Sequence, residues 1–250
     1  MTRLLVTRPR HQASELQGLL RRHGFDSVGV PTVEIDHGVD GELDRMLSEL
    51  DGAAWLVLTS ANGAEALVER LRATGRSLPP GTRVAAVGPA TADALSGAGI
   101  RVDHVPAAYL TVAIAEGLGD VRGHRVVLAR ADAATPNLHE ALRARGAIVE
   151  EVVAYRTIEG PAASRDLLGA ALHADLDGIT FTSSSTVRGL LRLASPIDRA
   201  RARAMPAFCI GPVTARTART AGFAVAAVAA EHTAAGLADA VATHFAREDR

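Results

Sequence analysis

The sequence contains no lysine, so all 27 of its basic residues are arginines. That absence excludes a Schiff-base lysine, a pyridoxal-phosphate lysine and the lysine of a P-loop. Cysteine occurs once, as Cys209, which excludes a disulfide framework and a cysteine-based zinc site. Because Cys209 stands in the apolar run 207–210, we interpret it as a buried structural thiol rather than a nucleophile. Aromatic residues make up only 3% of the chain, so the core must be aliphatic.

The common catalytic and cofactor motifs are also missing. The sequence has no dinucleotide-binding G-x-G-x-x-G, no Walker A loop, no H-E-x-x-H and no G-x-S-x-G nucleophile turn. The nine histidines are scattered, and none stands at metal-ligand spacing from another ligand. We therefore predict neither a metal nor a cofactor.

Charge and hydropathy exclude two classes of partner. The net charge is −1 and no extended basic tract occurs, so nothing in the sequence points to nucleic acid. No apolar run approaches the length needed to cross a membrane, and the first strand begins without a signal peptide. We expect a cytoplasmic monomer that acts on a small molecule, with no nucleic acid and no membrane as partner.

Short apolar, β-branched runs alternate with amphipathic helical patterns along the whole chain, which predicts parallel sheets with helices on both faces. The predicted strands are 3–8, 26–35, 54–59, 83–87, 102–106, 124–130, 148–158, 178–182, 206–210 and 224–229.

The chain also repeats itself at a constant shift of 122 or 123 residues. Residues 3–8 resemble 125–130, Leu58-Thr59-Ser60 resembles Phe181-Thr182-Ser183, and residues 87–92 resemble 210–215. Matching offsets at several independent places indicate a duplicated α/β unit. The sequence thus predicts two similar lobes, each a flavodoxin-like parallel sheet flanked by helices.

Two of the predicted strands, 26–35 and 148–158, are longer than an ordinary strand of about five or six residues. We interpret them as extended segments that each leave one lobe and enter the other. Lobe 1 is then discontinuous, and a two-stranded crossover joins it to lobe 2. The predicted boundaries are 1–33 and 160–250 for lobe 1, 38–152 for lobe 2, and 33–38 and 152–160 for the crossover.

Ligands of open parallel sheets bind outside the carboxyl ends of the strands. There, glycine and proline permit a sharp turn into a helix whose amides and hydroxyls favour an anion. Each hydroxyl can also be an ordinary helix cap, and each arginine can serve only to pair with a neighbouring carboxylate. The predicted binding residues are Arg8, Thr59, Ser60, Gly88, Thr91, Arg130, Thr182, Ser183, Gly211 and Thr214. Tyr155, in the second long strand, either faces a cleft between the lobes or is a half-buried strand residue.

Taken in order and spacing, these motifs are similar to the uroporphyrinogen-III synthase family over essentially the full chain. The matching segments are Leu4–Pro9, Leu58–Gly63, Val87–Ala92, Ala154–Thr157, Phe181–Ser184 and Ile210–Ala215. One departure is Ala131, which stands where many relatives have glycine.

The resemblance implies that the substrate is hydroxymethylbilane, a linear tetrapyrrole with eight carboxylates, supplied by the preceding deaminase. The family eliminates the hydroxyl of the first ring and closes the macrocycle with the last ring inverted. Tyr155 matches the family tyrosine proposed to help that hydroxyl leave. Ser60, Thr91, Ser183 and Thr214 match binding positions near the cleft. The alternative that the residues leave open is a two-lobed binding or sensor protein for a polyanionic ligand.

Overall fold

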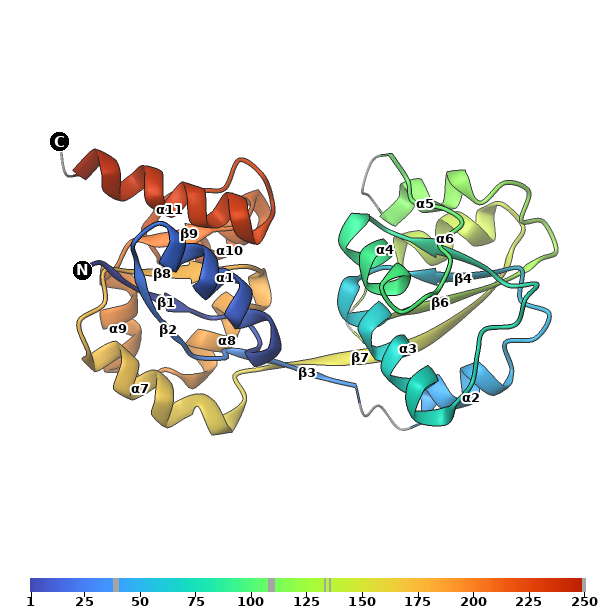
Figure 1. Ribbon diagram of the computed structural model, residues 1–250, viewed down its shortest axis with the longest axis horizontal. Coiled ribbons are helices and arrows are strands. Elements are labelled where there is room, and N and C mark those ends of the chain that lie inside the picture. The colour runs from blue at the N-terminus through green and yellow to red at the C-terminus, as the bar shows by residue number, and fades with distance from the viewer. Residues whose placement is uncertain (38–40, 108–110, 133, 135, 249–250) are drawn as a thin grey trace. The chain divides into compact units, whose positions relative to one another are not determined.

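The computed structural model describes residues 1–37, 41–107, 111–132, 134 and 136–248. The chain forms two compact units (Figure 1): unit 1 comprises Met1–Glu34 and Thr157–Arg250, and unit 2 comprises Ile35–Arg156. Each unit is built on a five-stranded sheet. Residue 38, where the predicted crossover segment 33–38 ends, lies outside the described residues.

The sheet of unit 1 has the strand order β10-β9-β8-β1-β2, and all its pairings are parallel. Its strands are β1 (Arg3–Val6), β2 (Asp26–Gly29), β8 (Gly178–Phe181), β9 (Ala207–Cys209) and β10 (Val225–Val228). Its helices are α1 (Arg10–Arg22), the short 3₁₀ turn η1 (Ala162–Ser164), α7 (Arg165–His173), α8 (Ser184–Leu193), α9 (Pro196–Ala204), α10 (Pro212–Thr220) and α11 (Ala234–Glu248).

Alternation along the strands divides the core of unit 1 into two layers. Leu4, Val6 and Phe208 point to one face, where α1 and α11 lie side by side (Figure 1). Leu5 and Cys209 point to the other face, which helices α7 to α10 cover. Both faces are buried, as expected of strands that read as continuous apolar runs.

The sheet of unit 2 has the order β3-β7-β6-β4-β5. Its strands are β3 (Val33–Asp36), β4 (Trp55–Leu58), β5 (Arg83–Ala86), β6 (Arg125–Ala131) and β7 (Ile148–Glu159). Its helices are α2 (Glu42–Ser48), α3 (Ala61–Thr74), α4 (Pro89–Ser96), α5 (Thr111–Gly117) and α6 (Asn137–Ala144). Helices α2 to α4 cover one face, and α5 and α6 cover the other.

The internal repeat appears in the topology of both sheets. Strands β9-β8-β1-β2 of unit 1 have the same order as β5-β4-β6-β7 of unit 2. Gly24 and Gly146, which follow α1 and α6, have φ of 84° and 83°, a left-handed conformation in which glycine carries no steric cost. The predicted fold class, two similar α/β lobes with helices on both faces of each sheet, is confirmed.

Three details of the predicted strands are wrong. The segment 26–35 is two strands, because the backbone leaves the sheet at Val30 and Pro31 before β3 begins. The segment 102–106 forms only an isolated bridge, His104 with Ala85, at the edge where unit 1 has β10. The second sheet is mixed rather than parallel. Strand β3, through which the chain enters unit 2, lies beside β7, through which the chain leaves it.

Buried Thr32 stands at the break between β2 and β3. Its hydroxyl lies 3.1 Å from the carbonyl oxygen of Thr7 and 2.9 Å from that of Thr186 in α8. Its own carbonyl accepts a hydrogen bond from the Gly160 amide at 2.9 Å, just after β7. The backbone of α8 approaches so closely at Gly189 that a methyl group there would overlap the Thr32 carbonyl oxygen. Thr32 therefore joins β1, α8 and the end of β7.

We predict that Gly189→Ala lowers the free energy of unfolding of unit 1 by about 1–3 kcal/mol, since the added methyl forces backbone apart. Gly169→Ala in α7 is the matched control, because a methyl there meets no atom within 4 Å and alanine favours a helix. Urea unfolding followed by circular dichroism measures both variants. Equal stability of the two would contradict the close approach at Thr32.

Candidate functional site

In each unit, the predicted binding residues follow three neighbouring strands. Strands β1, β8 and β9 of unit 1 end before Arg8, Thr182 and Gly211. In unit 2, Arg130 is the last residue but one of β6, and strands β4 and β5 end before Thr59 and Gly88. Parallel pairing places the carboxyl ends of the three strands at one edge of the sheet, so the structure brings these residues together within each unit.

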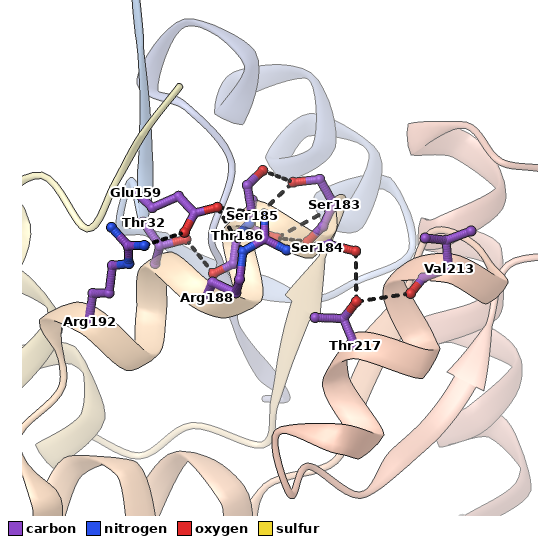
Figure 2. A network of polar contacts seen from close by, with 10 residues as sticks. All are labelled: Thr32, Glu159, Ser183, Ser184, Ser185, Thr186, Arg188, Arg192, Val213 and Thr217. Carbon is purple, nitrogen blue, oxygen red and sulfur yellow. Dashed lines mark hydrogen bonds and ion pairs between the residues drawn. The ribbon is translucent and has the colours of Figure 1, made fainter. Parts of the chain in front are cut away.

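Ser183 caps α8 in a hydroxyl-rich turn (Figure 2). Its Oγ accepts the Thr186 amide at 3.2 Å, and the Ser183 amide donates to Thr186 Oγ1 at 3.3 Å, which makes a reciprocal capping box. The Ser185 hydroxyl lies 2.8 Å from Ser183 Oγ. Ser184, one residue on, shares a hydrogen bond of 2.8 Å with Thr217 of α10. Ser183 is thus a true cap, within a turn that carries further hydroxyls.

Helix α10 begins at the other binding turn of unit 1. Gly211 is its first cap residue, in extended conformation, and Pro212 takes the first helical position, where no bonded amide is needed. The ring of His232 lies over this turn, because a methyl group on Gly211 would be 3.3 Å from His232 Cδ2. Thr214 is buried in the first turn. Glycine here leaves room for the imidazole ring.

In unit 2, Ser60 caps α3, and its Oγ accepts the Gly63 amide at 3.1 Å. Tyr155 of β7 lies against the same turn: a methyl group at Gly63 would be 3.3 Å from Ser60 Oγ and 3.7 Å from Tyr155 Cε1. The Tyr155 side chain is largely buried among aliphatic residues, such as Leu58 and Leu67. The structure therefore places the predicted catalytic tyrosine beside the predicted binding serine.

The second binding turn of unit 2 repeats the geometry of α10. Gly88 is extended, Pro89 takes the first position of α4, and Thr91 is buried in the first turn. Helices α3 and α4 contact each other, so the turns of Ser60 and Gly88 are neighbours.

Both predicted arginines form ion pairs. Arg8 Nη1 lies 3.0 Å from Glu15 Oε2 of α1. Arg130 Nη1 lies 3.0 Å from Glu151 Oε1 of the neighbouring strand, and His139 Nδ1 contacts the same oxygen at 2.9 Å. Arg130 is buried, where a cation needs such a partner. The pairing left open by the sequence is thus present at both positions.

The sequence reasoning missed three residues at this edge of unit 1: Thr217, His232 and Thr233. Thr217 bonds Ser184, and Thr233 caps α11 by accepting the Gly236 amide at 3.0 Å. The position of Thr233, between a predicted strand and an amphipathic helical pattern, is typical of a residue that caps the start of a helix. No local sequence pattern indicated Thr217, because its hydrogen-bond partner Ser184 lies 33 residues away in the sequence.

Three helices of unit 1 and two of unit 2 consequently begin at the sheet edge. Helices α3, α8 and α11 have side-chain caps, whereas α4 and α10 begin at a glycine without one. The positive ends of their dipoles favour anions. Within the described residues, no group of three His, Cys, Asp or Glu side chains could hold a metal ion. Neutral donors arranged in this way suit a ligand with several carboxylates.

Comparison with known proteins adds the family. The family model described as uroporphyrinogen-III synthase HemD matches residues 14–239. The uroporphyrinogen-III synthase of Synechococcus elongatus is 32% identical over 244 residues, which cover 94% of this chain and 92% of the relative. The porphyrin biosynthesis protein HemD of Ruminiclostridium josui is 29% identical over 87% of this chain and 44% of that protein.

Solved structures show the same fold. A mutant uroporphyrinogen III synthase of Thermus thermophilus has a TM-score of 0.68 at 21% identity, covering 99% of this chain and all of that one. The Helicobacter pylori uroporphyrinogen-III synthetase has a TM-score of 0.63 at 16% identity and covers both chains completely. The fold thus defines a two-unit α/β protein in which helices begin at the carboxyl edge of each sheet. The chain belongs to the uroporphyrinogen-III synthase family.

Cys209 lies at the end of β9, close to the site but fully buried. Burial raises the pKa of its thiol from the ordinary value near 9 to about 11, although Arg219 opposes the shift. The unfolded chain therefore releases the proton first as pH rises. We predict that the free energy of unfolding falls between pH 9 and pH 11, and that this part of the fall is absent in Cys209→Ala. Urea unfolding at a series of pH values measures the free energy of unfolding of the wild type and of Cys209→Ala. The same dependence on pH in both proteins would contradict the effect of burial.

Proposed function

We propose that this protein closes hydroxymethylbilane to uroporphyrinogen III, with loss of water and inversion of the last pyrrole ring. The observation that carries the proposal is the family match over residues 14–239. The geometry supports it, because the capped helix termini of both units offer donors for a substrate with eight carboxylates. The family match favours this enzyme over the alternative of a binding or sensor protein.

The proposed chemistry requires positioning more than strong catalysts. Loss of the hydroxyl from the first ring leaves an azafulvene-like electrophile, which the substituted carbon of the last ring attacks. The resulting spiro intermediate fragments and closes again with that ring inverted, and a proton is released. Since uncatalysed closure gives the symmetrical isomer, the enzyme must hold the chain of rings in one conformation. We assign this role to Ser60, Thr91, Ser183 and Thr214, with their helix amides.

We assign the remaining predicted residues to the same task. Thr59, Gly88, Thr182 and Gly211 shape the turns, and Arg8 and Arg130 flank them through their ion pairs with Glu15 and Glu151. Substrate is handed over by the preceding deaminase, and the enzyme acts as a cytoplasmic monomer without nucleic acid or membrane as partner. None of the described helices is long and apolar enough to span a membrane.

A coupled assay tests the activity. Porphobilinogen and its deaminase generate hydroxymethylbilane in the presence of this protein, and the products are oxidised and separated as isomers. We expect the type III isomer to dominate, with the type I isomer in the control without this protein. Type I alone in both reactions would refute the proposed activity.

Tyr155 is the proposed hydrogen-bond donor or acid for the departing hydroxyl, since a phenol hydroxyl can donate its proton to a leaving oxygen. We predict that Tyr155→Phe lowers kcat by about a hundredfold and leaves KM nearly unchanged, because the phenyl ring keeps the packing against Gly63. Tyr109→Phe, which changes the other of the two tyrosines, serves as the matched control. Unchanged turnover in Tyr155→Phe would remove this residue from the mechanism and leave the activity itself intact.

A further inference from the structure

Unit 2 contains a cavity of about 750 Å³ at the opposite ends of the helices that carry its candidate site. The cavity lies where α3 ends, where β5 begins, and in the connection after α4. The 14 residues of α3 place it about 20 Å from the Ser60 cap at the other end of that helix. A volume of several hundred Å³ is typical of sites for small molecules. The cavity is therefore separate from the candidate functional site.

The cavity has an apolar floor. Leu71 and Val84 are buried there, and Leu78 and Ile100 pack against the same core cluster of α3 and α4. Such a floor does not stabilise a bare inorganic anion, which stays hydrated, but it favours binding of a ligand with an apolar body.

The rim is cationic. Arg72, Arg76, Arg83 and Arg101 line the cavity with one carboxylate, Asp103. Both oxygens of Asp103 are engaged: Oδ2 accepts the Val84 amide at 2.9 Å, and Oδ1 pairs with Arg101 at 2.9 Å. The cavity lining thus contains four arginines and one carboxylate, whereas the chain as a whole has a net charge of −1.

The arginines of the rim differ in their partners. The Arg83 guanidinium stacks over the ring of Trp55, 4.3 Å from its centroid, and Trp55 belongs to the core layer under α5 and α6. The guanidinium groups of Arg72 and Arg76 form no hydrogen bond or ion pair within the described residues, and only the backbone groups of these two residues are bonded. Their positive charge is thus available to a ligand acid group.

We propose that this cavity binds a small organic acid, an anion with an apolar body that rests on Leu71, Leu78 and Ile100 while its acid group meets Arg72 and Arg76. The apolar floor favours the body of such a ligand, and the guanidinium groups of Arg72 and Arg76 favour its acid group. A neutral apolar compound lacks the charge, and inorganic phosphate lacks the body.

The test uses the full chain and the aromatic sulfonate 8-anilinonaphthalene-1-sulfonate, whose fluorescence rises in apolar sites. We expect one molecule to bind per chain, and Arg72→Gln/Arg76→Gln to weaken binding at least tenfold. Arg21→Gln/Arg22→Gln is the matched control, because it removes the same charge from the exposed last turn of α1. The control is expected to bind like the wild type. Circular dichroism and thermal unfolding verify that both double variants are folded.

Two further comparisons localise the probe. Ser60→Ala, at the other end of α3, is expected to leave its affinity unchanged, and uncharged N-phenyl-1-naphthylamine is expected to bind equally weakly to all variants. The proposal is overturned by absent binding, by equal loss in both arginine pairs, by wild-type affinity in Arg72→Gln/Arg76→Gln, or by loss in Ser60→Ala. The measurement needs no turnover, so its result is independent of the proposed synthase activity.

Discussion

Buried Thr32 reinforces, through its hydrogen bonds, the joining of the two parts of unit 1 that the pairing of β1 with β8 begins. Unit 1 combines two distant parts of the chain, and Thr32 bonds to Thr7 in the first part and to Thr186 and Gly160 in the second. A buried carbonyl or hydroxyl without a partner costs on the order of 1–3 kcal/mol, so these groups hold their partners in place. Because Thr186 also closes the capping box of Ser183, the same contacts fix the helix terminus that we assign to substrate binding. Near the end of β7, Glu159 adds ion pairs to Arg188 and Arg192 of α8 (Figure 2).

Both units present neutral hydrogen-bond donors, the amides at helix N-termini, at the edge of the sheet. A site built from lysines would instead present charges on flexible side chains. Backbone amides at a capped helix terminus are fixed by the helix itself, and they keep their polarity at any pH at which the protein is folded. A capping serine serves stability and ligand binding with the same oxygen, so the structural and functional interpretations of Ser60 and Ser183 are compatible. Such donors suit a reaction in which the substrate is flexible and its conformation decides the product.

The sequence predicts the repeat, the fold class and most of the strands, because each follows from local periodicity or from matching offsets along the chain. The break at Val30 and Pro31 had a local signal, the proline, which the length of the apolar run outweighed. The partners of the site residues could not be predicted, since they come from elsewhere in the fold. Glu151 meets Arg130 only because β6 and β7 are neighbours, and the ring of Tyr155 lies beside Ser60 only because β7 and α3 share a core layer. The cavity of unit 2 likewise forms only where the end of α3, the start of β5 and the connection after α4 come together.

The discontinuity of unit 1 also orders events during synthesis on the ribosome. The 122 residues of unit 2 are made after β1, α1 and β2 but before the rest of unit 1. At roughly 5–20 residues per second, this interval lasts on the order of 6–24 s. Leu4, Leu5 and Val6, which become fully buried, have only β2 to pair with during that time, because β8 and the helices that cover both faces are largely still to be made. Unit 2 can complete its core first, and the nascent N-terminal segment is the part of the chain that chaperones have most reason to protect.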